Sequence, residues 1–263
     1  MNLFKNKTIL ITGASSGIGE AFAIELNKLG AKLILTARSK DKLENLAEKM
    51  NNAIVISGDL SKRDFPNELY NEIKNKNIKV DIVINNAGFG FSGLFLNSSM
   101  ENYSGMIDLN IYSLVNLTHL FLSDMVENKS GGIINISSLA SFQPMPYFSI
   151  YAATKAFVTS FTIGLYEEYR KQNIRILGVC PGYTKTNFNK RADMTDNNHA
   201  TGYIMSAETV AKQSLKAYAN NKYILINGFT NKITKGIMRI LPQSISLKLT
   251  KMILKKGIDK GSW

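Results

Sequence analysis

The chain has 263 residues, of which 44% are hydrophobic and 20% are charged, and these values suit one large α/β domain. No apolar run reaches the roughly 18 residues that span a bilayer, and the N-terminus has no signal-peptide layout, so we expect a cytoplasmic protein. The single cysteine, Cys180, excludes an intrachain disulfide and favours a reducing compartment. The net charge is +12, which leaves nucleic acid, anionic membranes and anionic ligands as candidate partners.

Short apolar runs alternate with helical patterns along most of the chain. Many of the runs place Ile, Val and Leu on consecutive positions, which is typical of strands covered on both faces. Parallel neighbours need crossover connections, so this alternation predicts an α/β fold, a doubly wound (Rossmann-type) parallel seven-stranded sheet with helices on both faces. The predicted strands are 8–12, 32–36, 53–57, 80–85, 132–137, 174–179 and 223–226, and the predicted helices are 17–29, 40–50, 64–75, 99–127, 151–171 and 207–220.

The end of the chain departs from this alternation. We expect one domain, 1–263, with a core at 5–226 and a basic helical tail at 228–263, whose helices are predicted at 232–240 and 242–256. The tail holds eight basic residues and one acidic residue. We favour packing of the tail over a cleft or against a second subunit, and attachment to an anionic membrane is the alternative. Residues 182–205 are irregular and include a predicted lid, 188–205.

A glycine-rich turn follows the first predicted strand and opens a helix. Such a turn lets the backbone approach a pyrophosphate, which the free N–H groups of the helix N-terminus then face. A tight strand-to-helix connection is the alternative, but the position after the first strand favours phosphate. The residues of this predicted nucleotide site are Gly13, Ser15, Ser16, Gly17, Ile18 and Gly19.

Three later strand ends add to the nucleotide site. Arg38 follows the second strand, and the stretch 36–39 contains no acid. A guanidinium suits a 2′-phosphate, so NADP(H) is favoured over NAD(H); a solvated arginine is the alternative. The third strand is followed by Asp59 and Leu60. The Asp59 carboxylate could accept a hydrogen bond from the adenine amino group, or it could cap a helix. The fourth ends in Asn86, Ala87 and Gly88, which suit close approach to a ligand or an ordinary turn.

The stretch 138–155 has the composition of an active site. Tyr151 and Lys155 are four residues apart, so they share one face of a helix. Free tyrosine has a pKa of about 10, and an adjacent ammonium would lower it toward neutral pH. The Ser138 hydroxyl could bind a substrate oxygen.

Taken together, these motifs resemble the short-chain dehydrogenase/reductase family over residues 5–226. The resemblance implies that Tyr151 is the acid/base, that Lys155 holds the nicotinamide ribose and that Ser138 orients the carbonyl. It also implies that Asn110 ties a proton relay to the lysine, although a backbone-bonded helix kink is the alternative there. The nicotinamide would bind at Pro181, Gly182, Thr184 and Thr186.

The resemblance implies an NADP(H)-dependent enzyme that interconverts a carbonyl and an alcohol. The aromatic residues after the catalytic strands favour a hydrophobic small-molecule substrate, and we expect a homodimer or homotetramer. His119 and His199 lack partners at metal-ligand spacing, so no metal site is predicted. A non-catalytic NADP-binding regulator is the first alternative. The second alternative is a protein that binds nucleic acid or a membrane surface. The glycine turn and the Tyr-x-x-x-Lys set serve neither of these roles, and we expect no nucleic acid.

Overall fold

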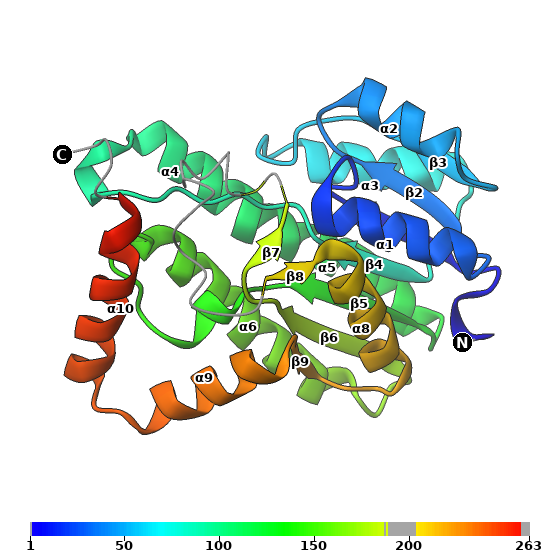
Figure 1. The fold of residues 1–263 in the computed structure, drawn as a ribbon. Helices are drawn as coiled ribbons and strands as arrows, with labels where there is room; N and C mark the ends of the chain where they lie inside the picture. Colours follow the sequence, from blue (N-terminus) through cyan, green and yellow to red (C-terminus); the bar gives the residue numbers. More distant parts are fainter. Residues whose placement is uncertain (1, 187, 189–203, 259–263) are drawn as a thin grey trace.

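The computed structural model describes residues 2–186, 188 and 204–258 (Figure 1). Seven parallel strands form one sheet in the order β3-β2-β1-β4-β5-β6-β9, which confirms the predicted doubly wound sheet. The bounds are β1 Thr8–Thr12, β2 Lys32–Thr36, β3 Ala53–Val55, β4 Ile82–Asn85, β5 Gly131–Ile136, β6 Ile174–Cys180 and β9 Ile224–Ile226.

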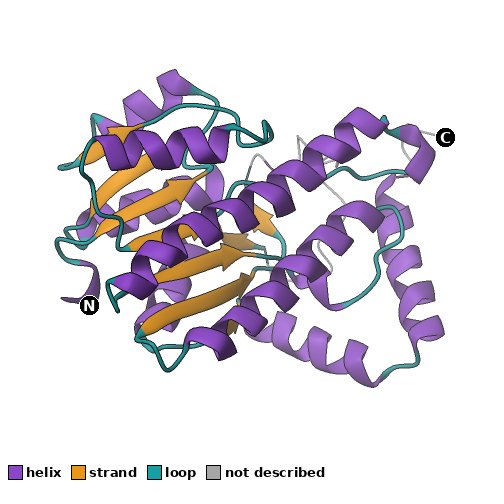
Figure 2. Ribbon diagram, turned by 180° about the vertical axis from the view of Figure 1, so that it is seen from behind, coloured by secondary structure: helices purple, strands orange, loops and turns teal. Residues whose placement is uncertain are grey.

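Helices cover both faces of this sheet (Figure 2). One hydrophobic core lies between the sheet and helices α1 (Gly17–Lys28), α2 (Lys40–Ala47) and α8 (Ala207–Ala219). A second core lies on the other face, against α3 (Phe65–Asn75) and α5 (Ser113–Glu127). Helix α6 (Ser149–Tyr169) packs against β6.

The central strands supply both cores from alternate positions. In β1, Ile9 and Ile11 belong to the first core, whereas Leu10 belongs to the second. Successive side chains of a strand point to opposite faces of its sheet. A strand covered on both faces therefore needs apolar residues at consecutive positions, which is why these runs are continuous rather than alternating with polar residues.

The predicted helix 99–127 is interrupted in the structure. It consists of α4 (Met100–Ile107), a π-helical turn (Asp108–Tyr112) and α5. A π turn inserts one extra residue into the i→i−4 pattern and often lies at a functional site. Here the turn contains Asn110, so the interruption falls on a predicted site residue.

The tail forms two helices beyond the sheet. Helix α9 (Phe229–Ile240) follows Gly228, whose φ of 84° is readily adopted only by glycine, and α10 (Gln243–Ile258) begins after Pro242. Figure 1 shows α9 running on from β9 along the lower edge of the molecule and α10 rising along the left edge, both outside the layers that cover the sheet. Two short strands, β7 (Thr184–Lys185) and β8 (Met205–Ser206), pair with each other. Most of the predicted lid lies outside the described residues.

Within the described part of the chain, no helix is both long enough and apolar enough to cross a bilayer.

Candidate active site

A cavity of about 460 Å³ lies at the carboxyl ends of the parallel strands. Its lining comes from the segments that follow β1 to β6 and from the tail. In open α/β sheets this edge is where ligands bind. Every predicted site residue lines the cavity except Gly19 and Asn110, which lie behind the lining.

The glycine turn is shaped by close backbone contacts. Gly13 and Gly17 have φ of 65° and 63°, in the region that favours glycine. A Cβ on Gly19 would overlap the Gly13 carbonyl and lie 2.6 Å from Asn86 Nδ2. The turn forms a cradle in front of α1, and its residues Ser15, Ser16 and Ile18 line the cavity.

Thr12 connects this turn to the neighbouring strand. Its hydroxyl accepts hydrogen bonds from the backbone N–H groups of Asn86 and Ala87, both at 2.9 Å, and Asn86 Nδ2 donates to the Thr12 carbonyl at 2.8 Å. Two segments of the nucleotide site are thereby held in register. The sequence shows only a threonine before the first glycine, and its role depends on the pairing of β1 with β4.

Arg38 and Asp59 lie at the far end of the cavity, after β2 and β3. Arg38 is exposed at the cavity edge, and within the described ranges no carboxylate is close enough to form an ion pair with it. Asp59 Oδ1 accepts from the Ser61 N–H at 3.0 Å and the Ser61 hydroxyl at 2.8 Å. The Asp59 carboxylate therefore orders its own turn, and it shares the cavity wall with Leu60.

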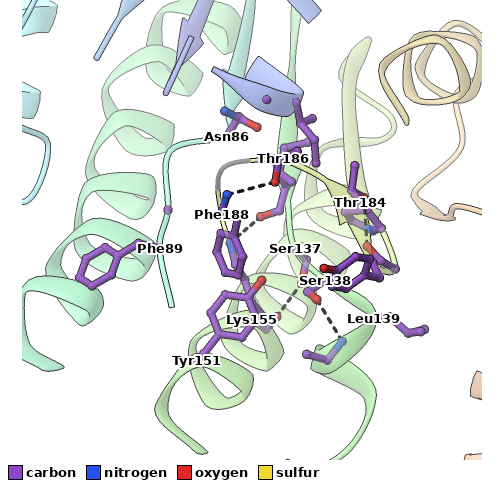
Figure 3. A pocket seen from close by; sticks show the side chains of 18 of the residues that line it. Asn86, Phe89, Ser137, Ser138, Leu139, Tyr151, Lys155, Thr184, Thr186 and Phe188 are labelled. Carbon is purple, nitrogen blue, oxygen red and sulfur yellow. Dashed lines mark hydrogen bonds between the residues drawn. The ribbon is translucent and has the colours of Figure 1, made fainter. Parts of the chain in front are cut away.

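Ser138, Tyr151 and Lys155 meet at the other end of the cavity (Figure 3). Ser138 follows β5, and its hydroxyl accepts from the Ala140 N–H at 3.1 Å. The Tyr151 ring packs beside Phe148 and Phe188, with ring centres 5.7 Å and 5.3 Å away. The hydroxyl of Tyr151 is thus presented toward Ser138 between aromatic walls.

Lys155 is held by the end of β5. Its Nζ donates to the Ile136 carbonyl at 2.9 Å, and the side chain is 5% exposed. Ser137, a residue that the sequence analysis did not single out, donates to the Lys155 carbonyl at 2.8 Å and bonds Thr159 Oγ1 at 2.7 Å. The sheet therefore fixes both the backbone and the ammonium of Lys155. A buried serine at a strand end is a weak signal in a sequence.

Burial sets the protonation states of the pair. Burial raises the pKa of Tyr151 to about 12, and a hydrogen bond with Ser138 opposes this effect. Burial also lowers the pKa of Lys155 to about 8. The sequence led us to expect that the ammonium would lower the tyrosine pKa, but Nζ lies 5.8 Å from the ring centre and desolvation is the larger effect. At pH 7 the tyrosine is neutral and most of the lysine is charged.

Asn110 supports this site from behind the cavity wall. Its Oδ1 accepts from the Phe89 N–H at 3.1 Å, and its Nδ2 donates to the Phe89 carbonyl at 3.0 Å and to Thr154 Oγ1 at 3.1 Å. A Cβ on Gly88 would lie 3.0 Å from Asn110 Oδ1 and 3.3 Å from Lys155 Nζ, so both groups approach one point. Asn110 therefore lies in the helix interruption and is also close to the ammonium of Lys155.

The segment after β6 closes the side of the cavity. Thr184 donates to the Gly182 carbonyl at 3.0 Å, and Thr186 Oγ1 accepts from the Phe188 N–H at 3.2 Å. A Cβ on Gly17 would lie 3.1 Å from the methyl group of Thr186, so this segment reaches the glycine turn. Pro181 lines the same wall.

The tail covers the cavity. Thr250 accepts a hydrogen bond from Gln143 Nε2 at 3.2 Å, and Lys235 Nζ lies 4.5 Å from the centre of the Phe142 ring. This arrangement agrees with the favoured interpretation that the tail packs over a cleft. The sequence did not identify the individual tail residues in the lining, which are Thr230, Asn231, Thr234, Lys235, Met238, Thr250 and Leu254.

Across the described residues, no cluster of three or more His, Cys, Asp or Glu side chains is placed to hold a metal ion. The buried Cys180 lies at the end of β6, and His199 lies outside the described residues.

The sheet, the glycine cradle and the Ser138–Tyr151–Lys155 group define a dinucleotide-binding α/β oxidoreductase. The family model described as short chain dehydrogenase matches residues 7–197. The chain therefore belongs to the short-chain dehydrogenase family. The matched range ends before α9 and α10, so the tail residues over the cavity lie beyond it.

Relatives agree with this assignment. The chain is 32% identical over 232 residues to an uncharacterized oxidoreductase of Staphylococcus aureus, a match that covers 88% of this chain and 98% of that one. It is 33% identical over 249 residues to the human very-long-chain 3-oxoacyl-CoA reductase, covering 91% and 77%. Among solved structures, a short-chain dehydrogenase from Sphingobium yanoikuyae in complex with NADPH superposes with a TM-score of 0.79 at 28% identity, covering 90% and 97%.

Proposed function

We propose that the protein is an NADP(H)-dependent oxidoreductase that interconverts a hydrophobic carbonyl compound and its alcohol. The observation that carries the proposal is the position of Ser138, Tyr151 and Lys155 in the same cavity as the glycine cradle. A dinucleotide suits the cradle because Gly13 and Gly17, which line the cavity, have no side chain, so a pyrophosphate could approach their backbone closely. The related structure in complex with NADPH supports the same cofactor class.

The chain's own groups would divide the remaining chemistry. Bound nicotinamide supplies or accepts the hydride. The Tyr151 hydroxyl donates a proton to the carbonyl oxygen in reduction and takes it back in oxidation, while Ser138 orients that oxygen by a hydrogen bond. Lys155 holds the ribose and, with Asn110, forms the inner end of a proton path. Neutral Tyr151 is the form that a reduction requires, which supports reduction at pH 7.

Reduction should lose rate in alkaline solution because Lys155 loses its charge there. We expect kcat/KM for carbonyl reduction to be level between about pH 6 and 7. It should then fall as the pH rises through about 8. Tyr151, with a pKa raised to about 12, stays protonated throughout this range, so the inflection belongs to the lysine.

Stopped-flow rates over this pH range with NADPH in excess would check the assignment. The Lys155→Arg variant provides the comparison, since a guanidinium does not titrate below about pH 12. Its residual activity should show no inflection near pH 8, and an unchanged inflection would contradict the assignment to Lys155.

The cofactor preference is proposed to come from Arg38. Its guanidinium is exposed, lines the cavity and forms no ion pair with a described carboxylate, so it is available for a 2′-phosphate. We expect the protein to bind NADPH more tightly than NADH. The Arg38→Asp substitution should weaken NADPH binding by about 10- to 100-fold, since it removes a charge-assisted contact and adds repulsion.

Fluorescence titration with both cofactors would measure this change. Lys42→Asp is the matched control, because Lys42 is exposed on the helix that follows Arg38 and is outside the cavity lining. Equal affinities of the unmodified protein for NADPH and NADH would refute the preference.

The substrate is proposed to be hydrophobic because most of the wall near Tyr151 is apolar. The wall includes Phe89, Phe142, Met145, Phe148 and Leu254. The 3-oxoacyl-CoA reductase among the relatives supports the inclusion of 3-oxoacyl thioesters among the candidates. NADPH oxidation measured against ketones, aldehydes, steroids and acyl thioesters tests the proposed function.

The same panel separates an enzyme from an NADP-binding regulator. A regulator would bind NADPH and leave it unoxidised even in a single turnover with excess carbonyl compound. Cytoplasmic location, one domain and a homodimer or homotetramer remain predictions, and we expect small-molecule substrates and no nucleic acid.

A further inference from the structure

Helix α9 turns its polar face toward the cavity and its apolar face away from it. Asn231, Thr234 and Lys235 line the cavity from this face, and the apolar side chain of Met238 lies beside them. On the opposite side, Phe229 and Ile240 are 76% and 85% exposed. Surface helices normally bury the apolar stripe and expose the polar one. The reversed orientation of α9 places Lys235 in the cavity wall.

Lys235 is the charged member of this inner face. Its side chain is half-buried, and Nζ lies over the ring of Phe142, four residues after Ser138. Within the described ranges no carboxylate forms an ion pair with Lys235. Burial raises the pKa of the Cys180 thiol at the end of β6; hydrogen bonds with Thr159, Ser141 and Ser137 oppose that effect, and the charge of Lys235 adds the smallest opposing contribution. These contacts place Lys235 at the Ser138 end of the cavity.

The described lining contains three other charged groups, and none of them neutralises Lys235. Arg38 and Asp59 lie at the adenine end, where Asp59 is bonded to Ser61. Lys155 donates to the Ile136 carbonyl and belongs to the catalytic group. A half-buried ammonium that has no counter-ion among the described residues can form a charge-assisted contact with an anion that enters the cavity. Lys235 is therefore matched to a charge that a ligand brings.

We propose that Lys235 forms an anion subsite, so that the substrate carries a carboxylate or phosphate group as well as its carbonyl. Apolar side chains such as Met145, Met238 and Leu254 contact the carbon chain between these two groups. Gln143 and Thr250, which are hydrogen-bonded to each other, add neutral polar groups beside the subsite. This inference rests on the proposed function and narrows its substrate class from a hydrophobic carbonyl compound to an amphipathic anionic one.

Matched substrates with and without charge test the subsite. Straight-chain ω-oxocarboxylic acids of increasing length would be compared with their methyl esters and with ω-oxoalkyl phosphates. The unmodified protein should prefer the anions, with an optimum length that reflects the spacing from Tyr151 to Lys235. The Lys235→Met variant should lower kcat/KM for the best anion by about 10- to 100-fold and leave the ester nearly unchanged. The phosphate and carboxylate arms identify which anion is used.

Three comparisons make the result specific. Lys232→Met removes an equal charge from an exposed position outside the lining and should change neither substrate's kinetics. Lys235→Arg should restore most of the preference, because it keeps the charge. The NADPH dissociation constant should be the same in all three variants, and weaker NADPH binding in Lys235→Met would instead assign the residue to the cofactor and overturn the proposal.

A binding measurement separates this inference from the proposed function. Calorimetric titration with octanoate and with octanol requires no turnover. Tighter binding of octanoate, abolished in Lys235→Met and kept in Lys232→Met, supports the subsite even if no carbonyl compound is reduced. Equal binding of octanoate and octanol by the unmodified protein, or an equal decrease of acid and ester turnover in Lys235→Met, would overturn the subsite while leaving carbonyl reduction intact.

Discussion

Replacement of Tyr151 by phenylalanine should lower the rate of NADPH-dependent carbonyl reduction by about 10²- to 10⁴-fold. The change removes one oxygen atom, the proposed proton donor, and leaves a ring that can still pack beside Phe148 and Phe188. NADPH affinity and the midpoint of thermal unfolding should change little, since the hydroxyl is not part of the glycine cradle. Single-turnover rates, NADPH titration and calorimetry on one protein preparation measure all three quantities.

Tyr166→Phe provides the matched control for this experiment. Tyr166 lies on the same helix, α6, but its ring packs against Tyr223 and it does not line the cavity. Its substitution should leave the reduction rate unchanged. A Tyr151→Phe enzyme that reduced carbonyl compounds at the unmodified rate would refute the role of this hydroxyl as the acid.

Replacement of Gly19 by alanine should damage both the fold and cofactor binding. The added methyl group would overlap the Gly13 carbonyl and lie 2.6 Å from Asn86 Nδ2. Relief requires movement of backbone, which is more costly than rotation of a side chain. We expect the free energy of unfolding to fall by about 1 to 3 kcal/mol. NADPH affinity should fall by about tenfold for each backbone N–H that can no longer donate a hydrogen bond to the cofactor after the cradle shifts.

Gly164→Ala is the internal comparison for this stability change. Gly164 lies within α6, and an added Cβ would meet nothing within 4 Å. Alanine favours a helix over glycine by up to about 1 kcal/mol, so this variant should be slightly more stable. Urea unfolding and NADPH titration of both variants would check the contrast. Gly19→Ala with unchanged stability and affinity would show that the close approach seen here is not required.

The architecture is readable from the sequence because its signals are local. Consecutive apolar residues such as Ile9, Leu10 and Ile11 indicate a strand covered on both faces, and alternation with helical segments then requires parallel pairing. The glycine turn and the Tyr151–Lys155 spacing also depend only on neighbours along the chain. The chemistry that each short motif implies is consequently visible before any tertiary contact is known.

Contacts between distant segments decide the rest. Thr12 gains its role from the pairing of β1 with β4, and Asn110, which lies in the π turn, bonds the backbone of Phe89. The direction of the Tyr151 pKa shift depends on how deeply the hydroxyl is enclosed, because desolvation can outweigh the attraction of a nearby charge.

The tail shows most clearly which properties are visible in the sequence and which depend on tertiary contacts. Its amphipathic pattern and positive charge are evident in the sequence, but periodicity describes only the relative positions of the two helix faces. The polar face of α9 is turned inward, with Lys235 over the ring of Phe142, so that Lys235 lines the cavity while Lys232 remains outside. The seven-stranded parallel sheet and the glycine turn follow from patterns among neighbouring residues, so the sequence predicts them without any tertiary contact. The tail residues that line the cavity depend on where α9 and α10 dock, which is set by contacts between distant segments and cannot be inferred from helical periodicity.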